Sequence, residues 1–303
     1  MYMKIYNEIL SFFPDNLNEI KTLDNDLIWD KAEEIRIRIG QPISIKLLND
    51  EIFFSEEISN EDMIRIIENF CNNSIYSVQN EINTGYITLR GGHRIGLSGT
   101  SVFFDNDIKN IKYISSLNIR IAREVKGCSD NILKKIVKGN IFENTLIVSP
   151  PGCGKTTILR DMIRNLSNGF NEFRGKNISL VDERSEIAAM YKGLPQNDVG
   201  IRTDVMCNLA KSVGIKMMIR SMGPQIIATD EIGTENDFNS VNDAVYSGVK
   251  LLLTVHGNDI EDVSKAFIEN RMFKNIVVLT KKNRPGELKK IYTLEDREYV
   301  LNC

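Results

Sequence analysis

The spacing of apolar residues along the chain changes near residue 130. Before it, short segments such as 34–39 (Glu-Ile-Arg-Ile-Arg-Ile) alternate apolar and polar side chains, and strict alternation predicts strands with one buried face. After it, short continuous apolar runs are separated by stretches with helical spacing. Continuous apolar strands that alternate with helices are typical of a parallel sheet covered by helices on both faces.

Two domains are therefore expected, a smaller α+β domain over 1–129 and an α/β domain over 130–303, with the linker near 127–130. In the first, we predict helices over 2–13 and 59–72, a hairpin of 34–39 with 43–48, a strand pair of 85–89 with 94–97, and a strand over 117–122. Ser59, with Asp62 three residues later, is a pattern that caps the start of a helix.

The second domain has a regular predicted order of elements. Strands are expected over 145–148, 178–181, 225–228, 251–255 and 275–279, and helices near 156–168, 208–220, 237–247 and 260–270. In parallel sheets of this kind, ligands bind at the carboxyl ends of the strands. Polar side chains that directly follow these strands are therefore the candidates for chemistry.

The first of these strands runs into a glycine-rich loop and then a helix. The loop matches the phosphate-binding pattern G-x-x-x-x-G-K-[ST] except at its first position, where Ser149 replaces glycine. Gly152 and Gly154 allow the backbone to curl so that its N–H groups point at a phosphate. The residues expected to bind the nucleotide are Ser149, Pro150, Pro151, Gly152, Cys153, Gly154, Lys155, Thr156 and Thr157.

The same pattern assigns roles to individual side chains. Lys155 is expected to reach the β- and γ-phosphates of ATP, and Thr156 to ligate Mg²⁺. Asp230 and Glu231 follow an apolar strand. We expect Asp230 to hold Mg²⁺ as well, and Glu231 to orient or deprotonate the attacking water.

Two further strands also end in ionisable residues. Glu183 follows the second strand and is a rival to Glu231 for the catalytic base, and the sequence leaves both open. His256 ends the strand Leu251-Leu-Leu-Thr-Val. It is either a structural histidine or a contact of the γ-phosphate or its water.

Composition narrows the class of protein. The 303 residues carry a net charge of −3 and a mean hydropathy of −0.20, which is typical of a globular chain. Five scattered cysteines without ligand spacing indicate neither a disulfide framework nor a zinc site, so reduced thiols in a cytoplasm fit best. The first residues lack the pattern of a secretory signal, and no apolar run is long enough to cross a bilayer. A membrane role, if there is one, is peripheral.

Charge is unevenly distributed along the first domain. Residues 1–70 hold 7 basic and 15 acidic side chains, whereas residues 71–135 hold 9 and 5. The basic segment permits an alternative, a P-loop ATPase that acts on nucleic acid, but few aromatic residues are interleaved with its cations. Nucleic acid is therefore not the expected partner. A nucleotide-gated scaffold that binds ATP without turnover is a third possibility, against which the pair Asp230 and Glu231 argues.

The order of the motifs is similar to that of a known group of proteins. The phosphate loop, VDERSE at 181–186, IIATDEIG at 226–233 and TVHG at 254–257 resemble the secretion-type ATPases of type II and type IV systems. Longer stretches resemble the stage III sporulation protein AA family: EIRIRIGQP at 34–42, GYITLRGGHRIGLSGTS at 85–101 and SSLNIRIAREVKGC at 115–128. This resemblance covers most of the chain.

The resemblance implies a RecA-like P-loop NTPase domain, a parallel sheet with helices on both faces, preceded by a smaller α+β domain. It implies a Mg²⁺-dependent ATPase that forms a homohexamer. It further implies a cytoplasmic motor of an endospore former, in the mother cell, that docks on the cytoplasmic faces of membrane proteins of the channel to the forespore. RecA-like ATPases typically complete their site with a cation from a neighbouring subunit. Arg120 and Arg123 are our candidates for that role, with solvent-facing arginines at a strand edge as the alternative.

Overall fold

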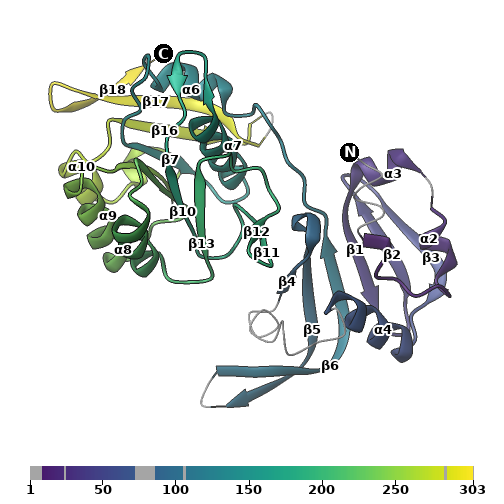
Figure 1. The fold of residues 1–303 in the computed structure, drawn as a ribbon. Helices are drawn as coiled ribbons and strands as arrows, with labels where there is room; N and C mark the ends of the chain where they lie inside the picture. Colours follow the sequence, from purple (N-terminus) through teal and green to yellow (C-terminus); the bar gives the residue numbers. More distant parts are fainter. Residues whose placement is uncertain (1–8, 24, 72–85, 105–106, 283–284, 303) are drawn as a thin grey trace. The chain divides into compact units, whose positions relative to one another are not determined.

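The computed structural model describes residues 9–23, 25–71, 86–104, 107–282 and 285–302 (Figure 1). The chain divides into two compact units. The first comprises Met1–Arg123 with Tyr191–Gln196, and the second comprises Glu124–Met190 with Asn197–Cys303. Within the described residues, no helix is both long and apolar enough to cross a membrane.

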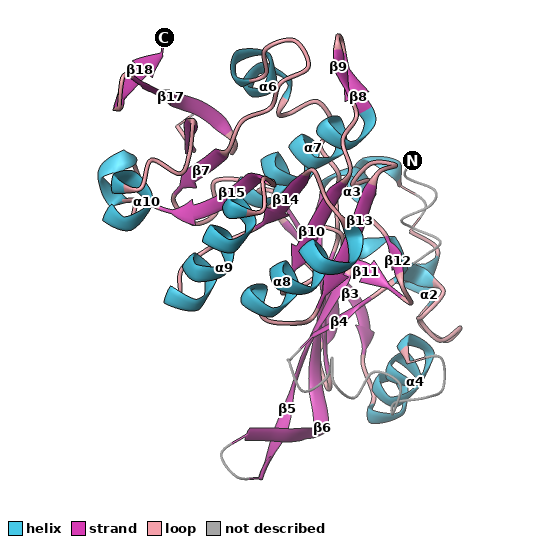
Figure 2. Ribbon diagram, turned by 60° about the vertical axis from the view of Figure 1, so that its left-hand side comes forward, coloured by secondary structure: helices cyan, strands magenta, loops and turns pink. Residues whose placement is uncertain are grey.

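The first unit is built on one antiparallel sheet with the strand order β3-β2-β1-β6-β5-β4. Its strands are β1 (Ala32–Arg38), β2 (Pro42–Leu47), β3 (Glu51–Glu57), β4 (Tyr86–Thr88), β5 (Arg94–Phe104) and β6 (Asp107–Arg120). Its helices are α2 (Asn18–Lys21), α3 (Asp26–Lys31) and α4 (Asn60–Phe70), with a 3₁₀ turn, η2 (Arg90–Gly92). Trp29, Ile35 and Ile37 are among the residues buried in its core. Beyond the pairing of β1 with β6, β5 and β6 continue as a two-stranded arm (Figure 2).

Several predictions for this unit are confirmed. The predicted hairpin is the antiparallel pair of β1 and β2. Ser59 caps α4 with a capping box, because its hydroxyl accepts from the Asp62 amide at 3.1 Å and its own amide donates to the Asp62 carboxylate at 3.1 Å. The strand pair and the strand over 117–122 correspond to β4, β5 and β6. Most of the predicted helix over 2–13, and residue 85 of the strand pair, lie outside the described residues.

The second unit contains an eight-stranded sheet with the order β13-β10-β14-β15-β7-β16-β17-β18. The strands are β7 (Thr145–Ser149), β10 (Ile178–Asp182), β13 (Thr203–Cys207), β14 (Ile226–Thr229), β15 (Lys250–His256), β16 (Asn275–Thr280), β17 (Glu287–Glu295) and β18 (Glu298–Asn302). From β13 to β16, each strand pairs with its neighbour in parallel. The last three strands, β16, β17 and β18, pair antiparallel. The pair of β8 (Gly169–Phe170) and β9 (Phe173–Arg174) completes the strands of this unit. The pair of β11 (Met190–Tyr191) and β12 (Leu194–Pro195) falls largely in the segment Tyr191–Gln196 of the first unit.

Helices cover both faces of this sheet, as predicted (Figure 1). The helices are α6 (Asp130–Ile136), α7 (Lys155–Asn168), α8 (Lys211–Met222), α9 (Glu235–Tyr246) and α10 (Lys265–Glu269). Ile147 of β7 belongs to the core beneath α6 and α7, whereas its neighbours Leu146 and Val148 belong to the core beneath α8, α9 and α10. Successive side chains of one strand thus enter different cores, which explains the continuous apolar runs.

The second unit contains α6 and the β8–β9 pair, which were not predicted, and it differs from the predictions in three further places. The edge strand β13 was not predicted, because its polar residues interrupt any apolar run. β17 and β18 add an antiparallel hairpin to a sheet that was predicted to be parallel. The single helix expected near 260–270 is a short 3₁₀ turn, η3 (Ile260–Asp262), followed by α10.

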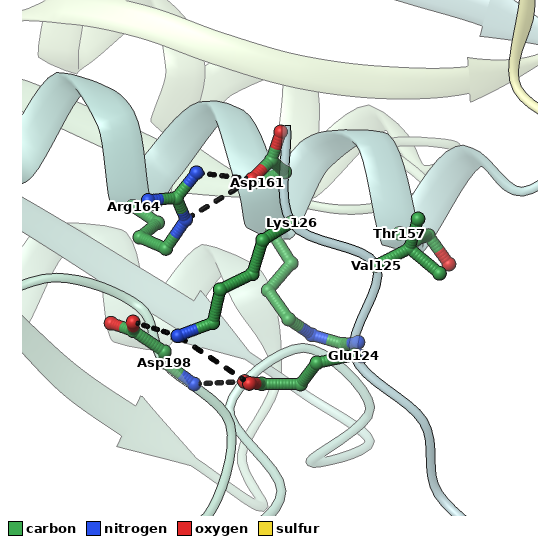
Figure 3. Close-up of a pocket in the computed structure, with 8 residues that line it drawn as sticks. Glu124, Val125, Lys126, Thr157, Asp161, Arg164 and Asp198 are labelled. Atoms are coloured by element: carbon green, nitrogen blue, oxygen red, sulfur yellow. Dashed lines mark hydrogen bonds and ion pairs between the residues drawn. The ribbon is translucent and has the colours of Figure 1, made fainter. Parts of the chain in front are cut away.

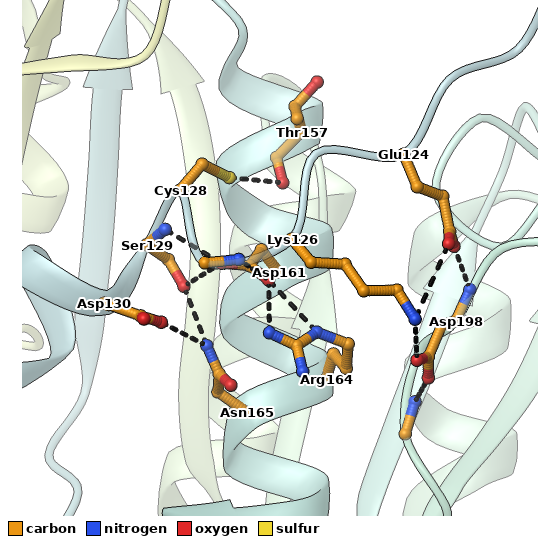
Figure 4. Close-up of polar contacts among 12 residues, drawn as sticks. Glu124, Lys126, Cys128, Ser129, Asp130, Thr157, Asp161, Arg164, Asn165 and Asp198 are labelled. Atoms are coloured by element: carbon orange, nitrogen blue, oxygen red, sulfur yellow. Dashed lines mark hydrogen bonds and ion pairs between the residues drawn. The ribbon is translucent and has the colours of Figure 1, made fainter. Parts of the chain in front are cut away.

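The division between the units falls at Arg123, six residues before the predicted boundary. The segment after it is fastened to α7 through Asp161 (Figure 4). The buried Asp161 carboxylate accepts from the amides of Gly127 at 3.0 Å and Ser129 at 2.8 Å, and from the guanidinium of Arg164 at 2.7 Å. Burial alone would raise the pKa of Asp161, but these donors hold it below its ordinary value.

A second set of contacts supports the same segment. Lys126 Nζ lies 2.7 Å from the Asp198 carboxylate, and Glu124 accepts from the Asp198 amide. The pocket between these residues and α7 holds about 10 Å³, no more than one water molecule (Figure 3). The contacts are therefore a structural joint and not a ligand site.

We expect Asp161→Asn to lower the free energy of unfolding by about 2 kcal/mol, because two backbone amides and Arg164 lose a charged acceptor. Urea denaturation followed by circular dichroism measures this. The matched control is Asp243→Asn, which removes an exposed carboxylate 3.8 Å from Lys216 and should cost less than about 0.5 kcal/mol. Equal effects of the two substitutions would contradict the assignment of Asp161 as an anchor.

Candidate functional site

The predicted phosphate loop connects the end of β7 to the start of α7. Gly152 and Gly154 have φ of +69° and +75°, a region that favours glycine. A Cβ on Gly154 would also approach the Gly286 amide nitrogen at 3.2 Å. Ser149, in contrast, is buried and does not have a positive φ. A side chain is therefore tolerated where the usual pattern has glycine.

Neighbouring segments hold this loop in place. The carbonyl of buried Cys153 accepts a hydrogen bond from the Gly286 amide at 2.6 Å, and the Ser149 carbonyl accepts from the Gly257 amide at 3.2 Å. The remaining residues expected to bind the nucleotide, Pro150, Pro151, Thr156 and Thr157, are partly or fully exposed. The loop thus presents accessible residues on an anchored backbone.

Three predicted motifs meet at Lys155, the first residue of α7. Its ammonium nitrogen lies 3.0 Å from His256 Nδ1 and 3.4 Å from Glu231 Oε1, and His256 Nε2 lies 3.1 Å from the same Glu231 oxygen. The Lys155 side chain is only 6% exposed. Burial lowers the pKa of Lys155, against the opposing effect of the Glu231 carboxylate. An anionic ligand that joins this group would favour the charged form of the lysine.

The backbone at Glu231 is left-handed, with φ of +44°, and such a conformation in a non-glycine residue needs support. Thr254, buried on β15, supplies it. Its hydroxyl accepts from the Glu231 amide at 2.8 Å, and its carbonyl accepts from the Ile232 amide at 3.0 Å. This turn directs the Glu231 carboxylate to Lys155 and His256.

Electrostatics keep Glu231 ionised. Burial works to raise the pKa of this carboxyl, but Lys155 and His256, together with Arg184 at 3.9 Å, hold it below its ordinary value. A carboxylate with a lowered pKa is available at neutral pH to accept a hydrogen bond from water. Beside Glu231 and His256 lies a cavity of about 740 Å³, whose wall includes Phe238 and Phe267, so solvent has access to this carboxylate.

Asp230 has the opposite electrostatic character. Its side chain is 4% exposed, and burial, followed by the nearby charge of Asp182, raises its pKa to about 6. Among the described residues, no group donates a hydrogen bond to its carboxylate. A buried carboxylate without donors fits a cation ligand.

Mg²⁺ fits these residues as the cation. In P-loop proteins the ion is held by the loop Ser or Thr, an acidic residue and the phosphates, and Thr156 and Asp230 would be the two protein groups here. No cluster of three or more His, Cys, Asp or Glu with metal-site geometry is found in the described part of the chain. A site with only two protein ligands does not require such a cluster.

Glu183, the rival for the base, is engaged elsewhere. Its carboxylate pairs with Lys211 of α8. The preceding residue, Asp182, is buried and accepts from the amides of Glu186, Ile187 and Ala188 at 2.8–3.0 Å. Asp182 therefore stabilises the turn after β10, and Glu183 pairs with the first residue of α8. Glu231, in contrast, contacts Lys155.

Arg120 and Arg123 belong to the first unit. The Arg123 guanidinium donates to the carbonyls of Trp29 at 3.2 Å, Ala32 at 2.6 Å and Asp30, and so caps the end of α3. Arg120 is exposed on β6, opposite Glu34 of β1. Arg123 thus has a structural use within its own unit that the sequence did not indicate.

Two contributors to the site were missed in the sequence. Thr254 was noted only as part of an apolar strand and of the TVHG motif, with no role of its own, although a lone hydroxyl in a buried run signals that a partner is needed. Gly286 lies more than 130 residues from Cys153, and no local pattern connects them. Only the pairing of β16 with β7 brings this glycine to the phosphate loop.

We expect Asp230→Asn to stabilise the nucleotide-free protein at pH 7 by about 2–3 kcal/mol, because a folded-state pKa near 6 against 3.8 disfavours the charged form. Below about pH 4, Asp230 is protonated in both the folded and the unfolded protein and does not destabilise the fold. As the pH rises toward and through 6, the parent loses stability, so the stabilisation by Asp230→Asn should be largest at pH 7 and vanish near pH 4. Denaturation at pH 4, 5 and 7 measures it. Asp204→Asn, on the exposed edge strand β13, is the control, and an equal gain there would refute the interpretation.

Comparison with known proteins shows which family the chain belongs to. A family model described as "Sporulation stage III, protein AA" matches residues 5–299. Stage III sporulation protein AA of Bacillus subtilis (strain 168) is 36% identical over 291 residues, which cover 94% of each chain. Protein SEEDLING PLASTID DEVELOPMENT 1 of Arabidopsis thaliana is 31% identical over 52% of this chain and 22% of its own length.

Solved structures show the fold. The pilus retraction motor PilT with bound ADP superposes with a TM-score of 0.57 at 13% identity, covering 82% of this chain and 74% of the other. The Legionella pneumophila ATPase DotB gives 0.53 at 14% identity, covering 89% and 75%. The chain accordingly has the RecA-like fold that the resemblance implied, and it shares this fold with both proteins. With a family model that spans nearly the whole sequence, the chain belongs to the stage III sporulation protein AA family.

Proposed function

We propose that the second unit binds ATP with Mg²⁺ and hydrolyses its terminal phosphoanhydride. One observation carries the proposal: Lys155 at the start of α7 lies 3.4 Å from the Glu231 carboxylate and 3.0 Å from His256. These three groups come from three separate segments at the carboxyl edge of one sheet. A phosphate-binding lysine, a carboxylate and a histidine at a loop that curls before a helix form an arrangement suited to phosphoryl transfer.

In this proposal, Lys155 changes partners when ATP binds. Without nucleotide, its charge is balanced by Glu231. The β- and γ-phosphates would take the ammonium group, while the amides of Gly152 to Lys155 and the start of α7 face the same anion. Glu231 is then released to orient and deprotonate the attacking water. His256 remains next to Glu231 and contacts the γ-phosphate or its water.

Mg²⁺, when bound, neutralises charge on the phosphates, and Thr156 and Asp230 would hold it. The raised pKa of Asp230 supports this role, because a buried carboxylate gains from an adjacent cation. Glu231, and not Glu183, is our choice for the base. The support is that Glu183 is paired with Lys211, away from Lys155.

The biological setting follows from family membership. We infer a motor ATPase of the secretion type that acts in endospore formation, in the cytoplasm of the mother cell. Its partners would be the cytoplasmic faces of membrane proteins of the mother cell to forespore channel. The assembly would be a homohexamer in which Arg120 serves the nucleotide of a neighbouring subunit. Arg123 supports that part of the first unit by capping α3.

Substitutions in the site test hydrolysis. We expect Lys155→Ala and Glu231→Gln each to lower phosphate release at saturating ATP by about 100-fold or more, since each removes a group that acts on the transferred phosphoryl or its water. Glu231→Gln should still bind a fluorescent ATP analogue. Glu183→Gln is the matched control and should keep turnover within about threefold of the parent. Unchanged turnover in Lys155→Ala would disprove the proposed function, and loss in Glu183→Gln with retention in Glu231→Gln would move the base to Glu183.

Assembly is tested by light scattering. We expect the mass to rise sixfold from the 34.5 kDa protomer when ATP and Mg²⁺ are added to the Glu231→Gln protein, in which bound ATP persists. The reason is that ATP bound between subunits stabilises the oligomer over the protomer. Arg120→Ala should weaken this response, whereas Arg65→Ala, an exposed arginine on α4, should not. A monomer under all conditions would rule out the ring.

A further inference from the structure

The loop that follows His256 is fastened to the C-terminal hairpin of the second unit. Asp259, three residues after His256, points its carboxylate at β17. Lys290 Nζ lies 2.9 Å from Oδ2, and the hydroxyl of Tyr292 donates to Oδ1 at 2.8 Å. Lys289 Nζ lies 3.0 Å from Oδ2 as well. The carboxylate is 18% exposed, so these partners occupy most of its surroundings.

An irregularity in β17 makes this contact possible. Lys290 pairs with Val278 of β16, and the register then shifts so that Lys289 has no partner on that strand. Successive side chains of a regular strand point to opposite faces, but a bulge re-aims one of them. Both ammonium groups therefore reach Asp259. Tyr292, two residues after Lys290, lies on the same face.

The same hairpin also touches the phosphate loop. The Gly286 amide, at the start of β17, donates to the Cys153 carbonyl at 2.6 Å. The Gly257 amide, directly after His256, donates to the Ser149 carbonyl at 3.2 Å. A Cβ on Gly257 would come within 2.9 Å of Val148, so the backbone there is closely packed. The phosphate loop, the His256 loop and the hairpin are thus joined pairwise.

The imidazole of His256 has little other support. Its side chain is 49% exposed, and its recorded partners are Lys155 and Glu231, both of which would change contacts when ATP binds. The position of the ring then depends on the backbone at the end of β15, where His256 pairs with Ser149 of β7. It also depends on the loop that follows, which the bonds of Asp259 hold against β17.

We propose that Asp259, clamped by Lys290 and Tyr292, is a positioning residue that sets the place of the His256 ring beside Glu231. This role rests on the proposed function, because it assigns the clamp to the hydrolysis described above. The clamp does not touch the nucleotide. It acts through His256, and it gives the β17–β18 hairpin a function besides completing the sheet.

Nuclear magnetic resonance of the imidazole rings tests the placement without any need for turnover. The chain has two histidines, and the second, His93, is buried in the first unit and serves as an internal reference. We expect the ring resonances of His256 to shift in Tyr292→Phe and in Asp259→Asn, while those of His93 stay in place. Tyr299→Phe is the matched control, since it deletes a comparable hydroxyl bond to the Phe273 carbonyl at 2.9 Å in the same hairpin.

Kinetics test the consequence. We expect Tyr292→Phe to lower kcat about fivefold and Asp259→Asn about tenfold, with KM for ATP within about twofold, because a displaced group weakens the transition state more than binding. Tyr299→Phe should match the parent.

Unmoved His256 resonances in both clamp variants, or equal shifts in Tyr299→Phe, would overturn the positioning role whatever the turnover. Shifted resonances with unchanged kcat would overturn its part in hydrolysis. If the parent protein itself releases no phosphate, the proposed function fails, and the resonances alone decide whether Asp259 places the ring.

Discussion

The ammonium group of Lys155 is nearly excluded from solvent at the first turn of α7, and the second unit is organised around its need for partners. A buried cation is destabilising unless anions or dipoles surround it. Glu231 and His256 supply part of that surrounding in the protein without nucleotide. Glu231 follows β14 and His256 ends β15, and the sheet places β15 next to β7 and β14 on the far side of β15. The order of the strands therefore decides whether this lysine can be buried.

The charges around Lys155 are also a source of instability. Asp230 is buried with a raised pKa, and Glu231 adopts a left-handed backbone. Both features oppose folding of the protein without a ligand, and the contacts of Thr254 offset the second of them. Strain and buried charge that have no structural use are typical of sites whose ligand completes them. The asymmetry of the two neighbouring carboxyls suits one for a cation and the other for water.

Distant segments set the precision of the site. The phosphate loop and the His256 loop bond to each other, and each also bonds to β17 or to Gly286 directly before it. On α7, Asp161 fastens the segment that follows the boundary between the units. The helix that begins with Lys155 is therefore held both at the phosphate loop and at Asp161, and these contacts make the position of the loop more rigid.

The sequence by itself determined the class of fold and predicted most residues of the candidate site. Apolar runs predicted the parallel strands, because each is buried on both faces, and the loop from Ser149 to Thr157 follows from local backbone demands. Tertiary structure alone decided what local patterns do not encode. It paired Glu231 with Lys155 but Glu183 with Lys211. It also gave Arg123 a capping role and brought Gly286 to Cys153. These outcomes depend on which strands become neighbours, and that is a property of the whole packed sheet, since contacts between remote segments leave no periodicity in either of them.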